Sequence, residues 1–315
     1  MRLLCATDLL PKSEPALERA GILADQLGAE LTLTHVVVPG ESERALEQTL
    51  RVAIARMKSR SRPPLWSSRR APNVTVRTGN PARLILETAA EVKARLLVMG
   101  PHRKRSLRDT FEGTLAEKAL AAKTCPLLIV QGEARAAYRR ILLALDLSDA
   151  SASAVRAAES LVVPSGVDAS VVHAYEPPYQ GMLHYVDIGP GTATRYANTW
   201  KGEARRAVRD LLKYESDDFS RYDILIAQQP AAVGILDTVE RYAPDLLVMG
   251  TRGGGRLHRA LVGSVANRVL HEINCDVLIV PEGSFGTARS KSVLGQRHPI
   301  ERRSAGPELQ TGGLQ

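Results

Sequence analysis

The pentapeptide LLVMG occurs twice in the chain, at residues 96–100 and again at 246–250. A second pair of apolar runs, TCPLLIV at 124–130 and NCDVLIV at 274–280, has the same separation of 150 residues. Near the start, the surroundings of Asp8 resemble those of Asp146, 138 residues later. A repeat of this length indicates a duplicated domain, because solenoid repeats are much shorter. The chain therefore consists of two copies of one unit, and the second copy is slightly longer.

Working outward from these runs, apolar segments alternate with stretches of helical pattern in both copies. The second copy shows it best, with short apolar runs at 141–146, 170–175, 223–227, 246–249 and 276–280. Between them we expect helices near 149–161, 199–213, 230–242 and from Ser264. Strands that are apolar on both faces and alternate with helices predict a parallel sheet covered on both sides. Right-handed crossovers make each copy a doubly wound, Rossmann-like α/β domain.

The repeat also predicts the domain boundaries. We expect a first domain at 1–135, a second at 136–282, and a basic, disordered tail at 283–315 that is rich in Gly, Ser and Arg. Residues 176–197 form a Pro- and Gly-rich insertion, expected to be a loop, that holds Tyr179, His184, Tyr185 and Tyr196. This segment is interpreted either as a lid over the second copy or as a surface excursion, and the sequence does not choose between them.

Composition places the chain among ordinary globular proteins, with 315 residues, 44% of them hydrophobic and 24% charged. No run approaches the 18 apolar residues of a membrane-spanning helix, and Asp8, Pro11 and Lys12 interrupt what would be a signal peptide. The three cysteines, Cys5, Cys125 and Cys275, lie in or beside apolar runs, which favours buried thiols in a reducing compartment. Zinc-type spacings are absent. We therefore expect a cytoplasmic protein without a membrane segment or a metal site.

The formal net charge of +8 is unevenly distributed. Residues 51–70 hold seven basic residues and no acidic one, the stretch 102–108 is also basic, and so is the tail. Trp66 is the one aromatic residue in the first two patches. Nucleic-acid readers usually combine a basic face with base-reading or stacking side chains. The patches are therefore interpreted as solvated surface, and a nucleic-acid partner is disfavoured.

A glycine-rich segment follows the fourth apolar run of the second copy. It reads GTRGGGRLHRALVGS from Gly250, so Gly253 comes after two residues and Gly263 after nine more, directly before Ser264. Glycines permit close approach of the backbone to an anion, and a helix that starts at Ser264 would offer free N–H groups and a favourable dipole. The alternative is that the glycines only form a loop and Ser264 only caps the helix. The full spacing after an apolar strand favours a phosphate site.

These residues resemble the universal stress protein family, in a tandem form. The family carries G-x2-G-x9-G-[ST] after its fourth strand, which Gly250, Gly253, Gly263 and Ser264 match. It also carries an aspartate after strand one in a pattern like A-x-D-x-S, as at Ala144, Asp146 and Ser148. The resemblance covers residues 1–281. It implies five-stranded domains with strand order 3-2-1-4-5 and a site for ATP, with Mg²⁺.

By this resemblance, the nucleotide-binding residues are Ala144, Asp146, Ala174, Met249, Gly250, Arg252, Gly253, Gly263, Ser264 and Val265. Those up to Gly250 would line the adenine and ribose, and those from Arg252 would hold the phosphates. The family also pairs domains through their last strands. The resemblance therefore implies either a homodimer or an internal pseudo-dimer, in which 127–130 lies beside 277–280.

The first copy departs from this pattern. A weaker site would consist of Asp8, Gly100, Gly113 and Thr114. Arg103 stands where the second glycine belongs, and its side chain would hinder the approach of a phosphate, although the basic loop around it would attract an anion. Thr114 and Glu117 also fit a capping box, which explains the threonine without a ligand. ATP binding is therefore expected in the second copy rather than the first.

The sequence offers no clear catalytic set. It has no Walker A lysine motif, no dinucleotide fingerprint after the first strand and no G-x-S-x-G elbow. His35 and His173 occupy equivalent positions in the two copies, so they are interpreted as structural. The leading hypothesis is a stress-response regulator in which ATP alters conformation or partner binding. The alternatives are a nucleotide-independent dimeric scaffold or chaperone-like protein, and a slow ATPase.

Overall fold

The computed structural model describes residues 1–39, 43–60, 71–101, 115–122, 124–134, 136–161, 167–177, 192–251 and 263–285. The first half consists, in chain order, of β1 (Arg2–Ala6), a 3₁₀ turn (Pro11–Ser13), α1 (Glu14–Leu27), β2 (Glu30–Val37), α2 (Glu43–Arg60), β3 (Asn73–Thr78), α3 (Pro81–Glu91), β4 (Leu96–Met99), α4 (Leu115–Ala122) and β5 (Leu127–Ile129). Strands and helices alternate as the repeat predicts.

The second half repeats this order. It consists of β6 (Arg140–Ala144), α5 (Asp149–Leu161), β7 (Asp168–Ala174), α6 (Thr192–Glu215), a 3₁₀ turn (Phe219–Arg221), β8 (Tyr222–Ala227), α7 (Ala231–Tyr242), β9 (Leu246–Gly250), α8 (Ser264–Glu272) and β10 (Asp276–Val280). The strands of the second copy coincide with its predicted apolar runs to within one or two residues at each end.

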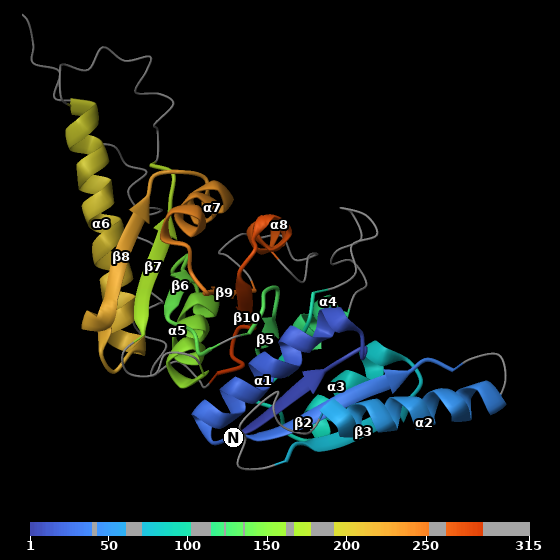
Figure 1. Cartoon of the computed structure of the whole chain (residues 1–315). Coiled ribbons are helices and arrows are strands. Elements are labelled where there is room, and N and C mark those ends of the chain that lie inside the picture. Colours follow the sequence, from blue (N-terminus) through green and yellow to red (C-terminus); the bar gives the residue numbers. More distant parts are fainter. Residues whose placement is uncertain are drawn as a thin grey trace, which may run out of the picture.

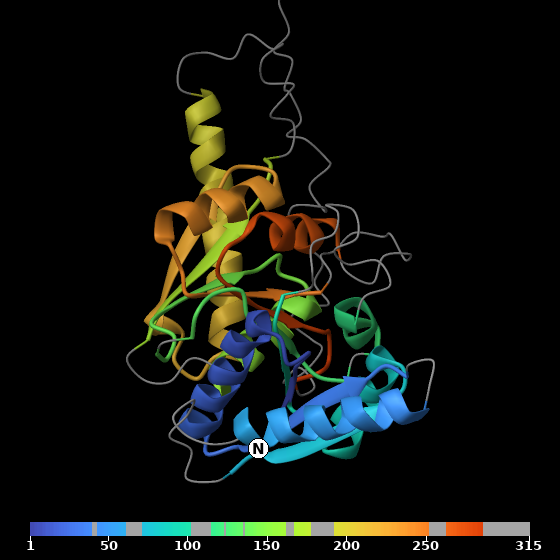
Figure 2. The same cartoon turned by 45° about the vertical axis from the view of Figure 1, so that its right-hand side comes forward.

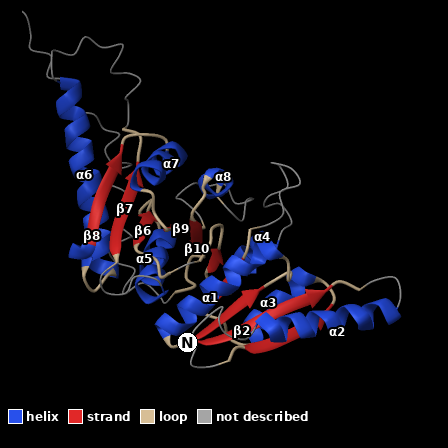
Figure 3. Cartoon of the chain, in the orientation of Figure 1, coloured by secondary structure: helices blue, strands red, loops and turns tan. Residues whose placement is uncertain are grey.

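The described strands form one sheet in the order β3-β2-β1-β4-β5-β10-β9-β6-β7-β8. Every pairing within a half is parallel. Each half thus has the predicted strand order 3-2-1-4-5, with the crossover helices on both faces of the sheet (Figures 1 and 3). The fold class expected from the sequence is confirmed.

The two halves join through their last strands. β5 and β10 pair antiparallel, with Leu128 opposite Leu278 at the centre of the register. The expected neighbourhood of 127–130 and 277–280 is therefore confirmed within one chain. The edge that would end each half in isolation lies in the middle of a continuous sheet, where its backbone groups are paired.

Side chains on the two faces of this sheet form two cores. Successive side chains along a strand point to opposite faces of the sheet. Leu3 therefore belongs to one core and its neighbour Leu4 to the other, and both are fully buried. The first core holds residues of α1, α2, α5 and α6, and the second holds residues of α3, α4, α7 and α8. Each core includes residues of both halves, so the halves share their packing.

A buried ion pair reinforces the junction. Arg19 of α1 donates through Nε to Asp276 Oδ2 at 3.2 Å, and both side chains are almost completely buried. Tyr138, in the connection between the halves, donates its hydroxyl to the same oxygen at 2.7 Å and lies under the Arg19 guanidinium. The backbone N–H of Gln131 donates to Asp276 Oδ1 at 2.8 Å. One carboxylate therefore joins the first half, the second half and their connection.

The insertion of the second copy differs from the prediction. We expected a loop at 176–197 and a helix from about 199, but α6 begins at Thr192, so residues 192–197 are helical. Tyr196 lies on this helix, with its ring in edge contact with Trp200 at a centroid separation of 5.9 Å. The helix extends beyond the ends of β7 and β8 (Figure 2). Residues 178–191, which include Tyr179, His184 and Tyr185, and the tail from 286 lie outside the described residues, so the lid and tail predictions stay untested.

Candidate functional site

The predicted site of the second copy lies where the central strands end. Ala144 of β6 is opposite Met249 of β9 and Val172 of β7. Ala174, the last residue of β7, is opposite Ala227. β6 and β9 are neighbours whose following connections cross to opposite faces of the sheet, which is the position where doubly wound sheets bind ligands. The structure therefore brings Ala144, Ala174 and Met249 to one edge.

Asp146 follows β6 and is held by its own turn. Its Oδ1 accepts hydrogen bonds from Ser148 N at 3.1 Å, Ser148 Oγ at 2.6 Å and Ser151 Oγ at 2.6 Å. Ser151 Oγ also accepts from Asp146 N at 2.8 Å, and the intervening Leu147 has a φ of 65°. Oδ2 makes no hydrogen bond with any described residue. The carboxylate is thus fixed through one oxygen, and the other is available to a ligand.

The serines around this turn also start α5. Ser148 Oγ accepts from Ser151 N at 3.3 Å, so Ser148 acts as the N-cap of the helix. The contribution of Ser151 to the carboxylate is a feature that the sequence reasoning missed. A serine five residues after the aspartate is its one signal, and the geometry appears only when the first turn of α5 folds back on β6.

Gly250 has a steric role that its place in the predicted phosphate motif does not reveal. A Cβ atom at this position would lie 2.7 Å from Ala150 Cβ and 3.0 Å from Ala150 C. The first turn of α5 therefore packs directly on the end of β9. Gly100 in the first half is similar, because a Cβ atom there would lie 3.3 Å from Lys12 O. Gly250 thus permits the close approach of α5, and Gly100 permits that of the 3₁₀ turn that precedes α1.

The second part of the motif begins a helix, as predicted. Gly263 precedes α8 as its N-cap and Ser264 is the first helical residue, without a side-chain cap. Gly263 N donates to Thr251 O at 3.0 Å, and Thr251 N donates to Val280 O at 3.1 Å. The start of α8 is thereby held beside Thr251, the residue that follows Gly250. The interpretation of Ser264 as a cap and nothing more is wrong, because the cap is Gly263.

Four predicted residues lie outside the described residues, namely Arg252, Gly253, Gly113 and Thr114. Val265, in the first turn of α8, is partly buried against the second core. Within the described ranges, no three His, Cys, Asp or Glu side chains gather in a position to hold a metal ion. The described site therefore consists of the Asp146 turn, the ends of β6, β7 and β9, and the start of α8.

The first half has a looser version of the same turn. Asp8 is exposed, and its Oδ1 accepts a single hydrogen bond, from Leu10 N at 3.0 Å. Ser13, the counterpart of Ser151, bonds instead with the Thr7 hydroxyl at 2.8 Å and donates to Leu10 O at 2.9 Å. The Asp8 carboxylate is therefore not fixed as that of Asp146 is.

The two equivalent histidines have matching structural contacts. His35 Nδ1 donates to Thr7 O and His173 Nδ1 donates to Leu145 O, both at 2.8 Å. Each bond connects the end of the second strand of its half to the end of the first. Both imidazoles thus help to align the strand ends at the site, as expected for structural residues.

No helix within the described ranges is both long enough and apolar enough to cross a membrane.

Comparison with known proteins shows the family of the chain. The model described as "Universal stress protein family" matches residues 1–131 and 137–281. A universal stress protein of Thermus aquaticus is 32% identical over 145 residues, which is 45% of this chain and 98% of the relative.

Solved structures resemble the chain over almost its whole length. A universal stress protein from Archaeoglobus fulgidus superposes with a TM-score of 0.61 and 17% identity, covering 90% of this chain and 98% of that one. Another solved universal stress protein is in complex with cAMP, and its alignment has 26% identity and a TM-score of 0.30 and covers 41% of this chain and 95% of that one. With a family match that covers both halves, this chain belongs to the universal stress protein family and contains two of its domains in tandem.

Proposed function

We propose that the second half binds ATP, together with Mg²⁺, and that the bound nucleotide changes how the protein contacts its partners. The observation that carries the proposal is the bond from Gly263 N to Thr251 O, at 3.0 Å. It holds the start of α8, which has no side-chain cap, beside the end of β9. Backbone N–H groups at the start of a helix are suited to bind phosphate.

The fixed carboxylate supplies the second half of the argument. Asp146 presents one oxygen that the turn does not use, on the neighbouring strand end. A ribose carries two hydroxyl groups that donate to such an acceptor. A site with an anion-binding helix start and a carboxylate acceptor on adjacent connections fits a mononucleotide better than a simple anion. Mg²⁺ would be held chiefly by the phosphate oxygens, as is usual for this ion.

The direct test is mass spectrometry of the small molecules released from the purified, full-length protein, together with thermal melting in millimolar ATP and Mg²⁺. We expect an adenine nucleotide to be released, or the melting temperature to rise by several degrees, because a ligand of the folded state stabilises it. cAMP, ADP and GTP are the comparison ligands. No released nucleotide and an unchanged melting temperature with all four ligands would overturn the proposal and leave the nucleotide-independent scaffold.

A substitution locates the site. Gly263→Asp places a carboxylate at the start of α8 and should abolish the shift in melting temperature that ATP produces. Gly202→Asp is the matched control, because Gly202 lies in α6 with nothing within 4 Å of an added Cβ. Loss of the shift in both variants would contradict this location. Release of phosphate that disappears in Asp146→Ala would instead support the slow ATPase.

A further inference from the structure

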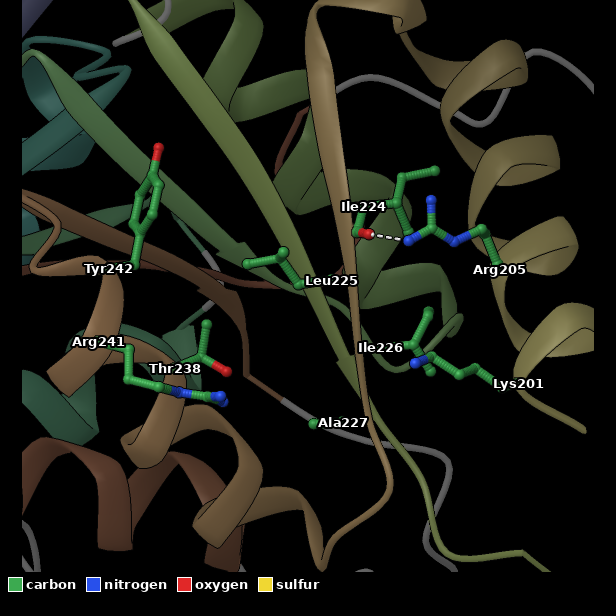
Figure 4. Close-up of a pocket in the computed structure, with 9 residues that line it drawn as sticks. All are labelled: Lys201, Arg205, Ile224, Leu225, Ile226, Ala227, Thr238, Arg241 and Tyr242. Carbon is green, nitrogen blue, oxygen red and sulfur yellow. Dashed lines mark hydrogen bonds between the residues drawn. The ribbon is translucent and has the colours of Figure 1, made fainter. Parts of the chain in front are cut away.

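An open groove of about 400 Å³ runs along β8, at the outer edge of the sheet. Its floor is formed by Ile224, Leu225 and Ile226 of β8. Lys201 and Arg205 of α6 stand on one side of the strand, and Arg241 of α7 stands on the other (Figure 4). No described strand pairs with β8 on this side.

The backbone of β8 offers hydrogen-bonding groups to the groove. Tyr175 N donates to Ala227 O at 2.9 Å, so Ala227 faces β7. Because the orientation alternates along a parallel strand, the N–H and C=O groups of Ile224 and Ile226 face outward. Arg205 Nη2 donates to Ile224 O at 2.8 Å, which agrees with this orientation (Figure 4). The remaining outward groups match what an added strand requires.

The groove is cationic. Lys201, Arg205 and Arg241 are all exposed, and none forms an ion pair with a described residue. Arg241 donates through Nε to Asp237 O in its own helix, at 3.1 Å. Positive charge thus stands on both sides of one strand edge, and β8 itself carries a single acidic residue, Asp223.

The opposite edge of the sheet, at β3, is built differently. Arg77 of β3 forms ion pairs with Glu87 at 3.3 Å and Glu91 at 3.2 Å. Thr88 and Thr238 occupy equivalent positions in α3 and α7, because each hydroxyl donates to the carbonyl four residues earlier. Three residues later, α3 has Glu91 where α7 has Arg241. The charge at this one helix position is therefore reversed between the two halves.

From these observations we propose that the β8 edge is a docking site for an extended, acidic segment of a partner protein, which adds to the sheet as a further strand. The N–H of Ile224 and both main-chain groups of Ile226 provide the attachment, and Lys201, Arg205 and Arg241 select acidic side chains. Charged residues at an edge also discourage pairing between neutral or basic strands. The chain's own stretch 283–315 has five basic and two acidic residues, so charge disfavours it as the occupant.

The test uses the full-length protein and a fluorescein-labelled octapeptide, VEETVEEV, in a fluorescence-polarisation titration. Two comparison peptides are used. In one, every Glu is replaced by Gln, and in the other, alternate backbone nitrogens are methylated. We expect the acidic peptide to bind, and either change to weaken it at least tenfold. Lys201→Gln with Arg205→Gln should weaken binding about tenfold. Arg206→Gln with Arg209→Gln is the matched control on the same helix, where both side chains are exposed and do not line the groove.

Each remaining outcome is informative. If no acidic peptide binds, or if both double variants weaken binding equally, the docking site is refuted and the cations only protect the edge. Strand addition would also be overturned if the backbone-methylated peptide bound as tightly as the unmethylated one. The same holds if a labelled single-stranded oligonucleotide bound more tightly than the peptide. Slower hydrogen exchange at Ile226 N–H in the complex would support it. Gly263 does not line the groove, so Gly263→Asp should leave peptide binding unchanged even where it abolishes the effect of ATP.

Discussion

Arg19 and Asp276 are separated by 257 residues in the sequence, yet they form a buried ion pair with an Nε to Oδ2 distance of 3.2 Å. The guanidinium comes from α1 and the carboxylate from the first residue of β10. The carboxylate also accepts from Tyr138 and from the backbone of Gln131, so its hydrogen-bonding capacity is well satisfied. Burial of the Tyr138 phenol, assisted by the Asp276 charge, raises its pKa well above the ordinary value.

The first prediction concerns this pair. Asp276→Ala leaves the Arg19 guanidinium buried without its counter-charge, and such a loss costs about 3–5 kcal/mol. We expect a correspondingly lower urea midpoint and melting temperature. Glu272→Ala is the control, because it removes an exposed pair with Arg268 that contributes about 0.5 kcal/mol. Equal effects of the two substitutions would show that the buried pair does not stabilise the junction.

The second prediction concerns the turn around Asp146. Ser151→Ala removes one of the three donors to Oδ1 and the acceptor for Asp146 N. We expect the unfolding free energy to fall by about 1 kcal/mol and the affinity for ATP to fall several-fold. Ser13→Ala should cost similar stability without an effect on ATP affinity, because Ser13 does not contact Asp8. Isothermal titration calorimetry measures the affinities, and equal losses in both variants would contradict a specific role of Ser151.

The third prediction compares a glycine that has no room for a side chain with a glycine that lies in an open part of a helix. Gly250→Ala would place its Cβ 2.7 Å from Ala150 Cβ, so α5 or β9 has to shift. Overpacking of this kind costs about 1–3 kcal/mol, which a lower melting temperature would reveal. Gly202→Ala in α6 meets nothing within 4 Å and should stabilise the helix by up to about 1 kcal/mol. An unchanged melting temperature in Gly250→Ala would show that this contact is easily relieved.

The fourth prediction concerns the thiols. Burial raises the pKa of Cys5 to about 12, that of Cys125 to about 11 and that of Cys275 to about 12. An unfolded cysteine titrates near 8.5, so the folded protein retains the thiol protons at higher pH. Alkylation by iodoacetamide at pH 8 should therefore be about a hundredfold slower in the folded protein than in urea. Rapid modification of Cys5 or Cys125 in the folded protein would contradict the burial of these two thiols.

The same pKa shifts determine the sign of a pH effect. Because the folded-state pKa values are raised, the stability that these thiols contribute is present below about pH 8.5 and is lost as the pH rises toward 12. Urea unfolding at pH 8 and pH 10 should show the decline. Cys5→Ala should reduce the slope, since Cys5 is fully buried. A stability that rises over this range would contradict the assignment.

Much of the fold follows from local sequence. The run DVLIV at 276–280 coincides with β10 because an apolar strand buried on both faces carries a strong signal. The predicted start of α6, near residue 199, is about seven residues too late, because the first turns of this helix carry a weak apolar signal. Its core contacts come from Ala204, Val208, Leu211 and Leu212, so helical periodicity begins well after Thr192.

The candidate site shows the same division. Asp146 and the helix start at Ser264 were predicted from residue type and spacing, and the structure places them on neighbouring connections. The Ser151 bond depends on how the first turn of α5 folds back on β6, and the contact between Gly250 and Ala150 depends on how closely α5 approaches β9. The pair formed by Arg19 and Asp276 depends on how the halves meet. The contact between Gly250 and Ala150 and the pair of Arg19 with Asp276 arise from packing between distant segments, which no local pattern encodes.

The pairing of β5 with β10 within one polypeptide also determines stoichiometry. Two separate chains that paired in this way would come apart on dilution, whereas a covalent connection replaces the second chain by a neighbour at high effective concentration. Each molecule then always has one tightly held aspartate turn and one loose turn. The proportion of the two kinds of turn is therefore the same whether the protein is scarce or abundant.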